Sequence, residues 1–349
     1  MRDIKLRAGL SLLNSEHGYI LGNRSARIGV STPFERSALL AVARNERVSS
    51  GEGVDEFLDR ISAAGFITRS GEESSGLPHR RDIATRLISD RIDSELLQCD
   101  WAPSSDLVKR ETGERIFRAR SSKTIAISGR GRVATLLALH LRTSGVGSIT
   151  FYDCCERTFI EPCDIGFASI TEREIGNNFY QHLDMQMEQL SFIASEIDSD
   201  NELGACSGEI DLIIHCGEMD IERTVDWMNS GQAHIVIPPH NGDEVAISPV
   251  IKGGHTPCLR CMQLHELDRF GFMRSERLPL GGSEDLPIIG ANFVAALVAS
   301  AALSYIDALK LKESYNGYGR ATYLRLNSLH ELEVENFARH PLCGCSYFE

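Results

Sequence analysis

The chain has 349 residues, 42% of them hydrophobic and 24% charged, with a formal net charge of −13. This length accommodates two domains, and the acidic balance argues against nonspecific nucleic-acid binding, which needs Lys and Arg to neutralise phosphates. Because no apolar run reaches the roughly 18 residues of a membrane span and the first residues do not resemble a signal peptide, we predict a cytoplasmic protein without a membrane or nucleic-acid partner.

The N-terminal part is predicted to form a small domain of strands followed by helices. The predicted strands are residues 10–22 and 26–31, joined by a turn around Asn23. The predicted helices are residues 34–46, opened by Pro33, and residues 54–65. Eight Lys or Arg stand against four acidic residues in positions 1–50, so this part suits an acidic partner. We assign residues 1–85 to this domain and residues 86–122 to a helical linker.

A doubly wound α/β domain is predicted from residue 123 to residue 349. A strand over 123–128, a Gly-rich turn, a helix over 135–145 and a strand over 148–153 form one strand–helix–strand unit. The later predicted elements are strands at 210–216, 233–239 and 321–329 and a long helix from Asn292. Residues 151–230 carry 18 Asp or Glu against three Arg, and this charge would repel a polyphosphate.

Two close cysteine pairs lie far apart in the sequence, Cys258 with Cys261 and Cys343 with Cys345. Two such hooks supply the four thiolates of a closed tetrahedral Zn²⁺ site, which leaves no open position for catalysis. The alternative is that the pairs are buried thiols. We predict a structural zinc ion, with the nearby His255, His265 and His340 orienting the turns and not binding the metal.

The glycine turn after the first strand of the α/β domain has the pattern of a nucleotide-binding loop. Gly129 and Gly131 permit a tight turn at a helix N-terminus, and Asp153 ends the next strand, where an acid contacts ribose hydroxyls. The same geometry also serves simply to pack a helix on a sheet. Arg130 and Arg132 occupy the turn, where their side chains either meet phosphate or fill its space.

These features together resemble the ThiF/MoeB family of ubiquitin-activating-like proteins, over roughly residues 120–349. The resemblance implies a nucleotide site at Gly129, Gly131, Arg132 and Asp153. That family's Asp-x-Asp is here Asp153-Cys154-Cys155, and its following Arg and Lys are missing. The family's Mg²⁺-handling Asp is replaced by Cys216, Gly217 or Glu218. We therefore predict a degenerate site that does not use ATP or Mg²⁺, and we assign no catalytic residue.

A closer resemblance covers the whole chain. The segments "AISGRGRVATLLALHLRTSGVGSITFYD", "SPVIKGGHTPCLRCMQLHELDR" and "HPLCGC" are similar to the ThiF-like leader-binding components of azoline-forming cyclodehydratases. These proteins begin with a winged-helix-like, PqqD-like peptide-recognition domain. The resemblance implies a homodimer that binds the leader of a ribosomally made precursor peptide and presents it to a YcaO-type cyclodehydratase in bacteriocin-like biosynthesis.

The leader would add as a strand to the edge of the N-terminal sheet, with a helix as the other wall. The residues that this docking implies are Ala26, Arg27, Ile28 and Val30 on the strand and Phe57 and Ile61 on the helix. Two other functions stay open. One is an ATP-dependent enzyme that adenylates a peptide or carrier-protein carboxylate. The other is a sulfur-carrier activator with a persulfide on Cys154 or Cys155.

Overall fold

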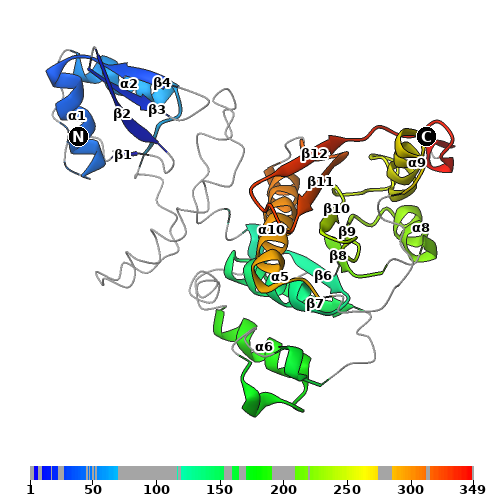
Figure 1. Cartoon of the computed structure of the whole chain (residues 1–349). Helices are drawn as coiled ribbons and strands as arrows, with labels where there is room; N and C mark the ends of the chain where they lie inside the picture. Colours follow the sequence, from blue (N-terminus) through cyan, green and yellow to red (C-terminus); the bar gives the residue numbers. More distant parts are fainter. Residues whose placement is uncertain are drawn as a thin grey trace. The chain divides into compact units, whose positions relative to one another are not determined.

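The computed structural model describes residues 4–69, 116–152, 159–164, 170–190, 209–218, 221–273, 285–311 and 315–347, apart from short gaps at 7–9, 17, 23–26, 45, 47, 49–50, 52 and 117–118. The chain forms two compact units, Met1–Phe117 with Ser199–Asn201 and Arg118–Asp198 with Glu202–Glu349; we call them the N-terminal and C-terminal units (Figure 1). Residues 70–115 lie outside the described residues, so the predicted boundary at residue 85 and the linker over 86–122 remain predictions.

The N-terminal unit contains a three-stranded antiparallel sheet of β2 (Ser11–Ser15), β3 (Gly18–Gly22) and β4 (Arg27–Val30), paired in that order. The single strand predicted over residues 10–22 was wrong, because the chain reverses after Ser15 and Ser15 pairs with Gly18. A side chain at position 18 is excluded, since a Cβ there would lie 2.7 Å from the Val30 carbonyl oxygen.

Two helices follow this sheet, as the sequence predicts, and β1 (Ile4–Leu6) pairs antiparallel with β5 (Ile67–Arg69). Helix α1 spans Pro33–Ala43 and helix α2 spans Val54–Ala63. A core between sheet and helices includes the buried side chains of Leu21, Val30, Ala38, Leu39, Val42, Phe57, Leu58, Ile61 and Phe66. The unit therefore has a hydrophobic core of its own.

The C-terminal unit is built on a parallel sheet in the order β7-β6-β8-β9, which confirms the predicted doubly wound α/β fold. Its strands are β6 (Thr124–Ser128), β7 (Ser148–Tyr152), β8 (Leu212–Cys216) and β9 (His234–Ile237). From β6 the chain proceeds to β7 on one side, and β8 lies on the other. This reversal makes the carboxyl ends of β6 and β8 the topological switch point, the place where ligands bind in such sheets.

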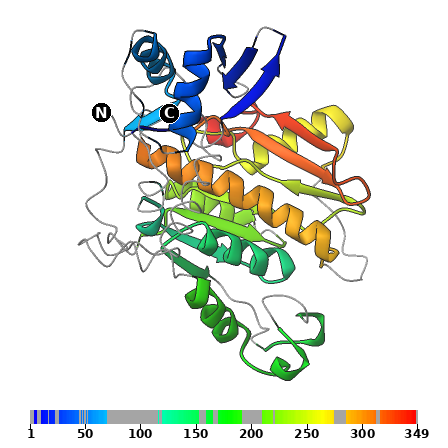
Figure 2. The same ribbon diagram turned by 90° about the vertical axis from the view of Figure 1, so that its left-hand side faces the viewer.

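Helices cover the parallel sheet. Helix α5 (Arg132–Thr143) follows β6, α6 (Phe179–Leu190) packs against α5, and α8 (Ile221–Asn229) precedes β9. Figures 1 and 2 both show α10 (Ile288–Leu311) running along α5. By length and composition α10 would suffice to cross a membrane. Here it is a core helix, because its buried residues Val294, Ala295, Val298, Ala302 and Leu303 belong to the main hydrophobic cluster.

A second, antiparallel sheet joins β10 (Glu244–Ile247), β11 (Arg320–Arg325) and β12 (Leu332–Asn336), with α9 (Leu259–Phe270) beside it (Figure 2). The sequence predicted β11 and did not identify β10 or β12. Three short 3-10 turns, at Pro162–Asp164, Glu172–Glu174 and Gly344–Tyr347, complete the described elements.

Candidate functional site

The four predicted metal ligands meet beside the antiparallel sheet. Cys258 is the N-cap of α9 and Cys261 lies in its first turn. Cys345 lies in the 3-10 turn Gly344–Tyr347, and Cys343 directly precedes this turn. The four Sγ atoms lie within 4.8 Å of one another. The separations are 3.7 Å for Cys258–Cys261, 3.4 Å for Cys258–Cys343 and 3.3 Å for Cys261–Cys345.

This donor set fits a tetrahedral metal ion. Zinc–thiolate bonds of about 2.3 Å give sulfur–sulfur edges of about 3.8 Å in a regular tetrahedron, close to the separations above. Cys258, Cys261 and Cys343 are buried, so the site has no open side for substrate. The hydrogen bond from Cys258 lowers the pKa of Cys261 and raises that of Cys258, so Cys261 is the thiol that ionises most readily. The cluster could therefore hold an ion such as Zn²⁺.

Histidines support the cysteine turns from outside. The imidazole of His340 is 2% exposed; its Nε2 lies 2.9 Å from an Asp268 carboxylate oxygen, and its Nδ1 accepts from the Leu342 amide. The His265 ring packs edge-on against His340, with centroids 4.7 Å apart. Both rings thus connect α9 to the C-terminal hook. The orienting role of these histidines at a bound metal stays a prediction.

The glycine turn lies at the switch point, where β6 and β8 end. Gly129 and Gly131 have φ angles of 99° and 117°, which glycine adopts at little cost. A Cβ at Gly129 would lie 1.9 Å from the Cys216 carbonyl oxygen, so this glycine is required for β6 and β8 to end side by side. Asp153, Cys154 and Cys155 lie outside the described residues, and their predicted roles are not addressed by the structure.

The two arginines of the turn contact protein groups. Arg130 forms an ion pair with Asp164 at 2.7 Å and stacks over the Phe179 ring at 4.6 Å. The Arg132 guanidinium donates to the Leu286 carbonyl at 2.9 Å. A carboxylate oxygen of Asp285 lies 3.4 Å from the Arg132 backbone nitrogen. The segment before α10 therefore lies against the turn, at the place where a nucleotide phosphate would meet the helix N-terminus.

Strand β8 ends at Cys216 and is followed by Gly217 and the exposed Glu218. Burial raises the pKa of the Cys216 thiol to about 12, so this residue is not a thiolate at neutral pH. His215 lies 3.0 Å from the Ser128 hydroxyl through Nδ1 and 2.7 Å from the Glu218 carbonyl through Nε2. Nε2 must carry the proton to donate to a carbonyl, so Nδ1 accepts from Ser128. Both side chains are buried, and this pair holds β6 to β8.

Strand β4 is an edge of the N-terminal sheet, as the peptide-docking prediction requires. The Arg60 guanidinium of α2 donates to the Gly29 carbonyl at 2.9 Å and pairs with Glu35 of α1 at 2.9 Å. The Gly29 carbonyl therefore points away from β3, toward the side of β4 on which no described strand pairs. Arg27 is exposed and Ile28 half-buried, while Ala26 lies outside the described residues.

The docking prediction needs a correction at two positions. Phe57 and Ile61 are fully buried, because these side chains form the core of the unit. They present no surface to a ligand. A groove with a volume of about 350 Å³ lies where α1 meets β3 and the end of β4, and Val30, which is 2% exposed, is one of its lining residues. Its walls include Arg36, whose guanidinium stacks over the Tyr19 ring at 4.6 Å.

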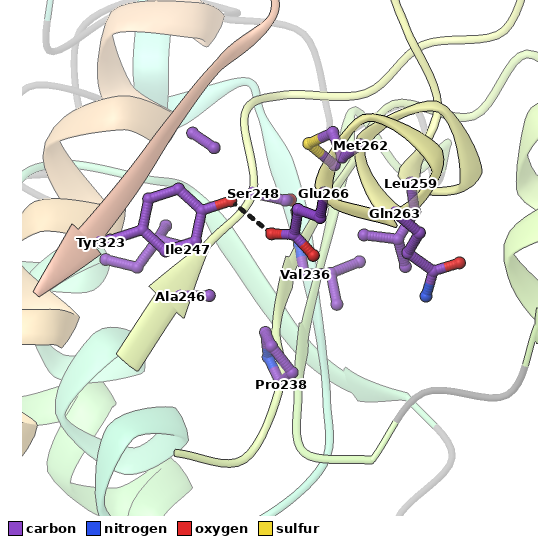
Figure 3. Close-up of a pocket in the computed structure, with 11 residues that line it drawn as sticks. Val236, Pro238, Ala246, Ile247, Ser248, Leu259, Met262, Gln263, Glu266 and Tyr323 are labelled. Carbon is purple, nitrogen blue, oxygen red and sulfur yellow. Dashed lines mark hydrogen bonds between the residues drawn. The ribbon is translucent and has the colours of Figure 1, made fainter. Parts of the chain in front are cut away.

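A small cavity lies between α9 and the strands β9, β10 and β11 (Figure 3). Its walls are mostly apolar, and the buried Glu266 carboxylate accepts a hydrogen bond from the Tyr323 hydroxyl at 2.8 Å. The volume is about 30 Å³, room for one or two water molecules. This cavity is too small for a cofactor or a peptide side chain.

Sequence reasoning missed Glu35, Arg60 and Asp285. The Thr32-x-x-Glu35 spacing is a capping-box signature that identifies Glu35 in advance, and the structure has both of its hydrogen bonds. Nothing in the sequence points to Asp285, because its contact with Arg132 joins positions 153 residues apart.

No family model matches the sequence, and no curated protein matches it. Among solved structures, the microcin C7 biosynthetic enzyme MccB in complex with N-formylated MccA is 14% identical, with a TM-score of 0.64 over 98% of this chain and 99% of that chain. E. coli MccB with ATP gives the same values. PaaA is 13% identical, with a TM-score of 0.56 over 81% of this chain and 91% of that chain. This likeness shows that the chain has the ThiF/MoeB-like fold of MccB.

Proposed function

We propose that this chain is a peptide-binding protein that presents a ribosomally made precursor peptide to a separate YcaO-type cyclodehydratase in bacteriocin-like biosynthesis. The observation that carries the proposal is the likeness to MccB. It extends over 98% of the chain, and so includes the N-terminal unit, and MccB is seen with MccA bound. The N-terminal unit supplies a free sheet edge next to a groove, which suits an extended peptide.

Backbone hydrogen bonds to β4 would provide affinity in this complex, and side-chain pockets would provide specificity. The excess of Lys and Arg in residues 1–50 favours an acidic leader. We place the peptide along Arg27–Val30, with its flanking residues reaching the groove beside Arg36. Phe57 and Ile61 then support the edge from the core of the unit.

The C-terminal unit would serve as a platform. Its cysteine cluster would hold a structural Zn²⁺, which joins α9 to the C-terminal hook. We expect the protein to act as a homodimer in the cytoplasm and to leave ATP chemistry to the cyclodehydratase. The internal contacts of Arg130 and Arg132, and the position of Asp285 at the glycine turn, support a role without nucleotide.

A second candidate is an ATP-dependent enzyme that adenylates a peptide or carrier-protein carboxylate. MccB has the same fold and is seen with ATP, and this observation favours it. The adenylating enzyme would bind Mg·ATP at the glycine turn and catalyse pyrophosphate exchange when its peptide is present.

One pair of measurements separates the two candidates. The precursor peptide encoded beside the gene, labelled with fluorescein, is titrated with the zinc-loaded protein, and Mg·ATP is titrated separately by calorimetry. The proposal expects peptide binding in the micromolar range or tighter, with no heat from Mg·ATP up to millimolar concentration. Micromolar ATP binding with pyrophosphate exchange establishes the adenylating enzyme, and absence of peptide binding overturns the proposal.

A further inference from the structure

The segment that leads into α10 contacts the glycine turn at Gly131 and Arg132. An Asp285 carboxylate oxygen lies 3.4 Å from the Arg132 backbone nitrogen. A Cβ on Gly131 would be 2.8 Å from the same oxygen. Because Gly131 has no side chain, the Asp285 carboxylate can approach the turn closely. In nucleotide-binding proteins with such a turn, a phosphate occupies the corresponding position.

A second contact holds the segment in place. The Arg132 guanidinium donates to the Leu286 carbonyl at 2.9 Å, and the Leu286 side chain is 6% exposed within the main hydrophobic cluster. The position of Asp285 is thus anchored by packing on one side and by a charged hydrogen bond on the other. The position of Asp285 therefore does not depend only on its 3.4 Å contact with the Arg132 backbone nitrogen.

The chemistry of the two anions is equivalent at this position. The first turn of a helix carries unpaired N–H groups and a partial positive charge that stabilise carboxylates and phosphates alike. Gly131, the N-cap of α5, has no side chain with which to cap the helix. MccB, which shares this fold, is seen with ATP. Asp285 and a nucleotide phosphate would therefore compete for the same donors, with direct charge repulsion between them.

We propose that Asp285 and Leu286 form a strap that closes the glycine turn against nucleotide phosphates. Nucleotide enters only when the strap is displaced. This inference deepens the proposed function, because it supplies a physical cause for a glycine turn without ATP chemistry. It does not depend on whether the N-terminal unit binds a peptide.

The test compares Asp285→Asn and Asp285→Ala with wild type, using Mg·ATP and inorganic pyrophosphate as probes in calorimetry on the full zinc-loaded chain. Asn keeps the size of the side chain and removes the charge, whereas Ala removes both. Asp226→Asn is the matched control, because Asp226 is an exposed residue of α8 and gives the same change in net charge. Thermal unfolding verifies that each variant is folded.

We expect both Asp285 variants to bind Mg·ATP and pyrophosphate at least tenfold more tightly than wild type and the Asp226→Asn control. A role limited to capping α5 would change the unfolding temperature and leave both affinities unaltered, which overturns the strap. Micromolar binding by wild type also overturns it. Peptide binding by the same samples is measured in parallel, so that failure of the strap and failure of the proposed function are distinguishable.

Discussion

At the scale of single residues, the Glu35 carboxylate organises the N-terminal unit. Burial raises its pKa, but the hydrogen bonds from the Thr32 and Ser31 amides, together with Arg60, outweigh burial and lower the pKa below 4.5. A carboxyl group whose pKa is depressed in the folded state stabilises the protein above its unfolded pKa, and this stability is lost as the pH falls. Glu35 thus links α1, α2 and β4 only while it is ionised.

Glu35→Gln should therefore lower the stability of the N-terminal unit by about 1–2 kcal/mol at pH 7. The difference between variant and wild type should shrink as the pH falls below 4.5. Calorimetric unfolding of the full chain between pH 3 and pH 7 measures this effect. A difference that stays constant over the whole range would show that the charge of Glu35 is not involved.

Cys261 is the most buried member of the cysteine cluster, with 0% exposure. If the cluster holds Zn²⁺, Cys261→Ser should reduce the bound zinc from about one ion per chain to a small fraction of that, because serine is a poor ligand for this ion. Metal analysis after gel filtration measures the content. Cys216→Ala is the control, since Cys216 is a buried cysteine of β8 outside the cluster. Equal zinc in both variants would contradict the assignment.

At the scale of elements, the β4 edge is the feature on which peptide binding depends. The Gly29 backbone faces away from β3, where its C=O accepts a hydrogen bond from Arg60. An added strand would bond to its N–H. Gly29→Pro removes this N–H at an edge position, where proline is tolerated. Gly29→Ala keeps the N–H, and its Cβ would meet nothing within 4 Å.

We expect Gly29→Pro to weaken peptide binding at least tenfold and Gly29→Ala to change it less than threefold, as measured by fluorescence anisotropy with the labelled precursor peptide. Equal affinity for both variants would place the peptide elsewhere, and the groove beside Arg36 would be examined next. The unfolding temperature of each variant shows whether the sheet itself is intact.

At the scale of the whole molecule, a buried ion pair joins the start of the C-terminal unit to α10. Arg120 is 0% exposed and contacts both Asp307 carboxylate oxygens, at 2.9 and 2.7 Å. Removing one partner of such a pair leaves an uncompensated buried charge. Arg120→Met should therefore cost about 3–5 kcal/mol, and the double variant Arg120→Met with Asp307→Leu much less. Urea unfolding measures the free energy of unfolding of both variants. Equal losses of stability would mean that an uncompensated buried charge is not the cause of the destabilisation.

The two units have separate hydrophobic cores, so the metal and the peptide should act on different parts of the chain. A zinc chelator should lower the unfolding temperature of the C-terminal unit, because metal binding contributes directly to folding. The affinity of the N-terminal unit for the peptide should stay within twofold of its value for the zinc-loaded protein. Parallel loss of peptide binding and zinc would show that the units depend on each other.

Local patterns in the sequence predicted much of this fold. Apolar runs identified β6, β7, β8, β9 and α10. Strands β6, β8 and β9 are buried along their whole length, as expected where helices cover both faces of a parallel sheet. The spacing of Cys258, Cys261, Cys343 and Cys345 predicted that these thiols would meet, because the geometry of a metal site restricts the spacing of its ligands. Strands β10 and β12 were missed although β12 (LEVEN) alternates apolar and polar residues, because the two strands have only four and five residues.

The sequence by itself determined the α/β class of the chain and the identity of its four clustered cysteines, because both depend on local periodicity and spacing. Only the tertiary structure decided which side chains are accessible. Phe57 and Ile61 lie in the core and not in a groove, and Asp285 lies at the glycine turn. The physical reason is that burial and charge contacts join residues remote in sequence, as Asp285 and Arg132 are by 153 positions, and no local pattern records which of these pairs will meet.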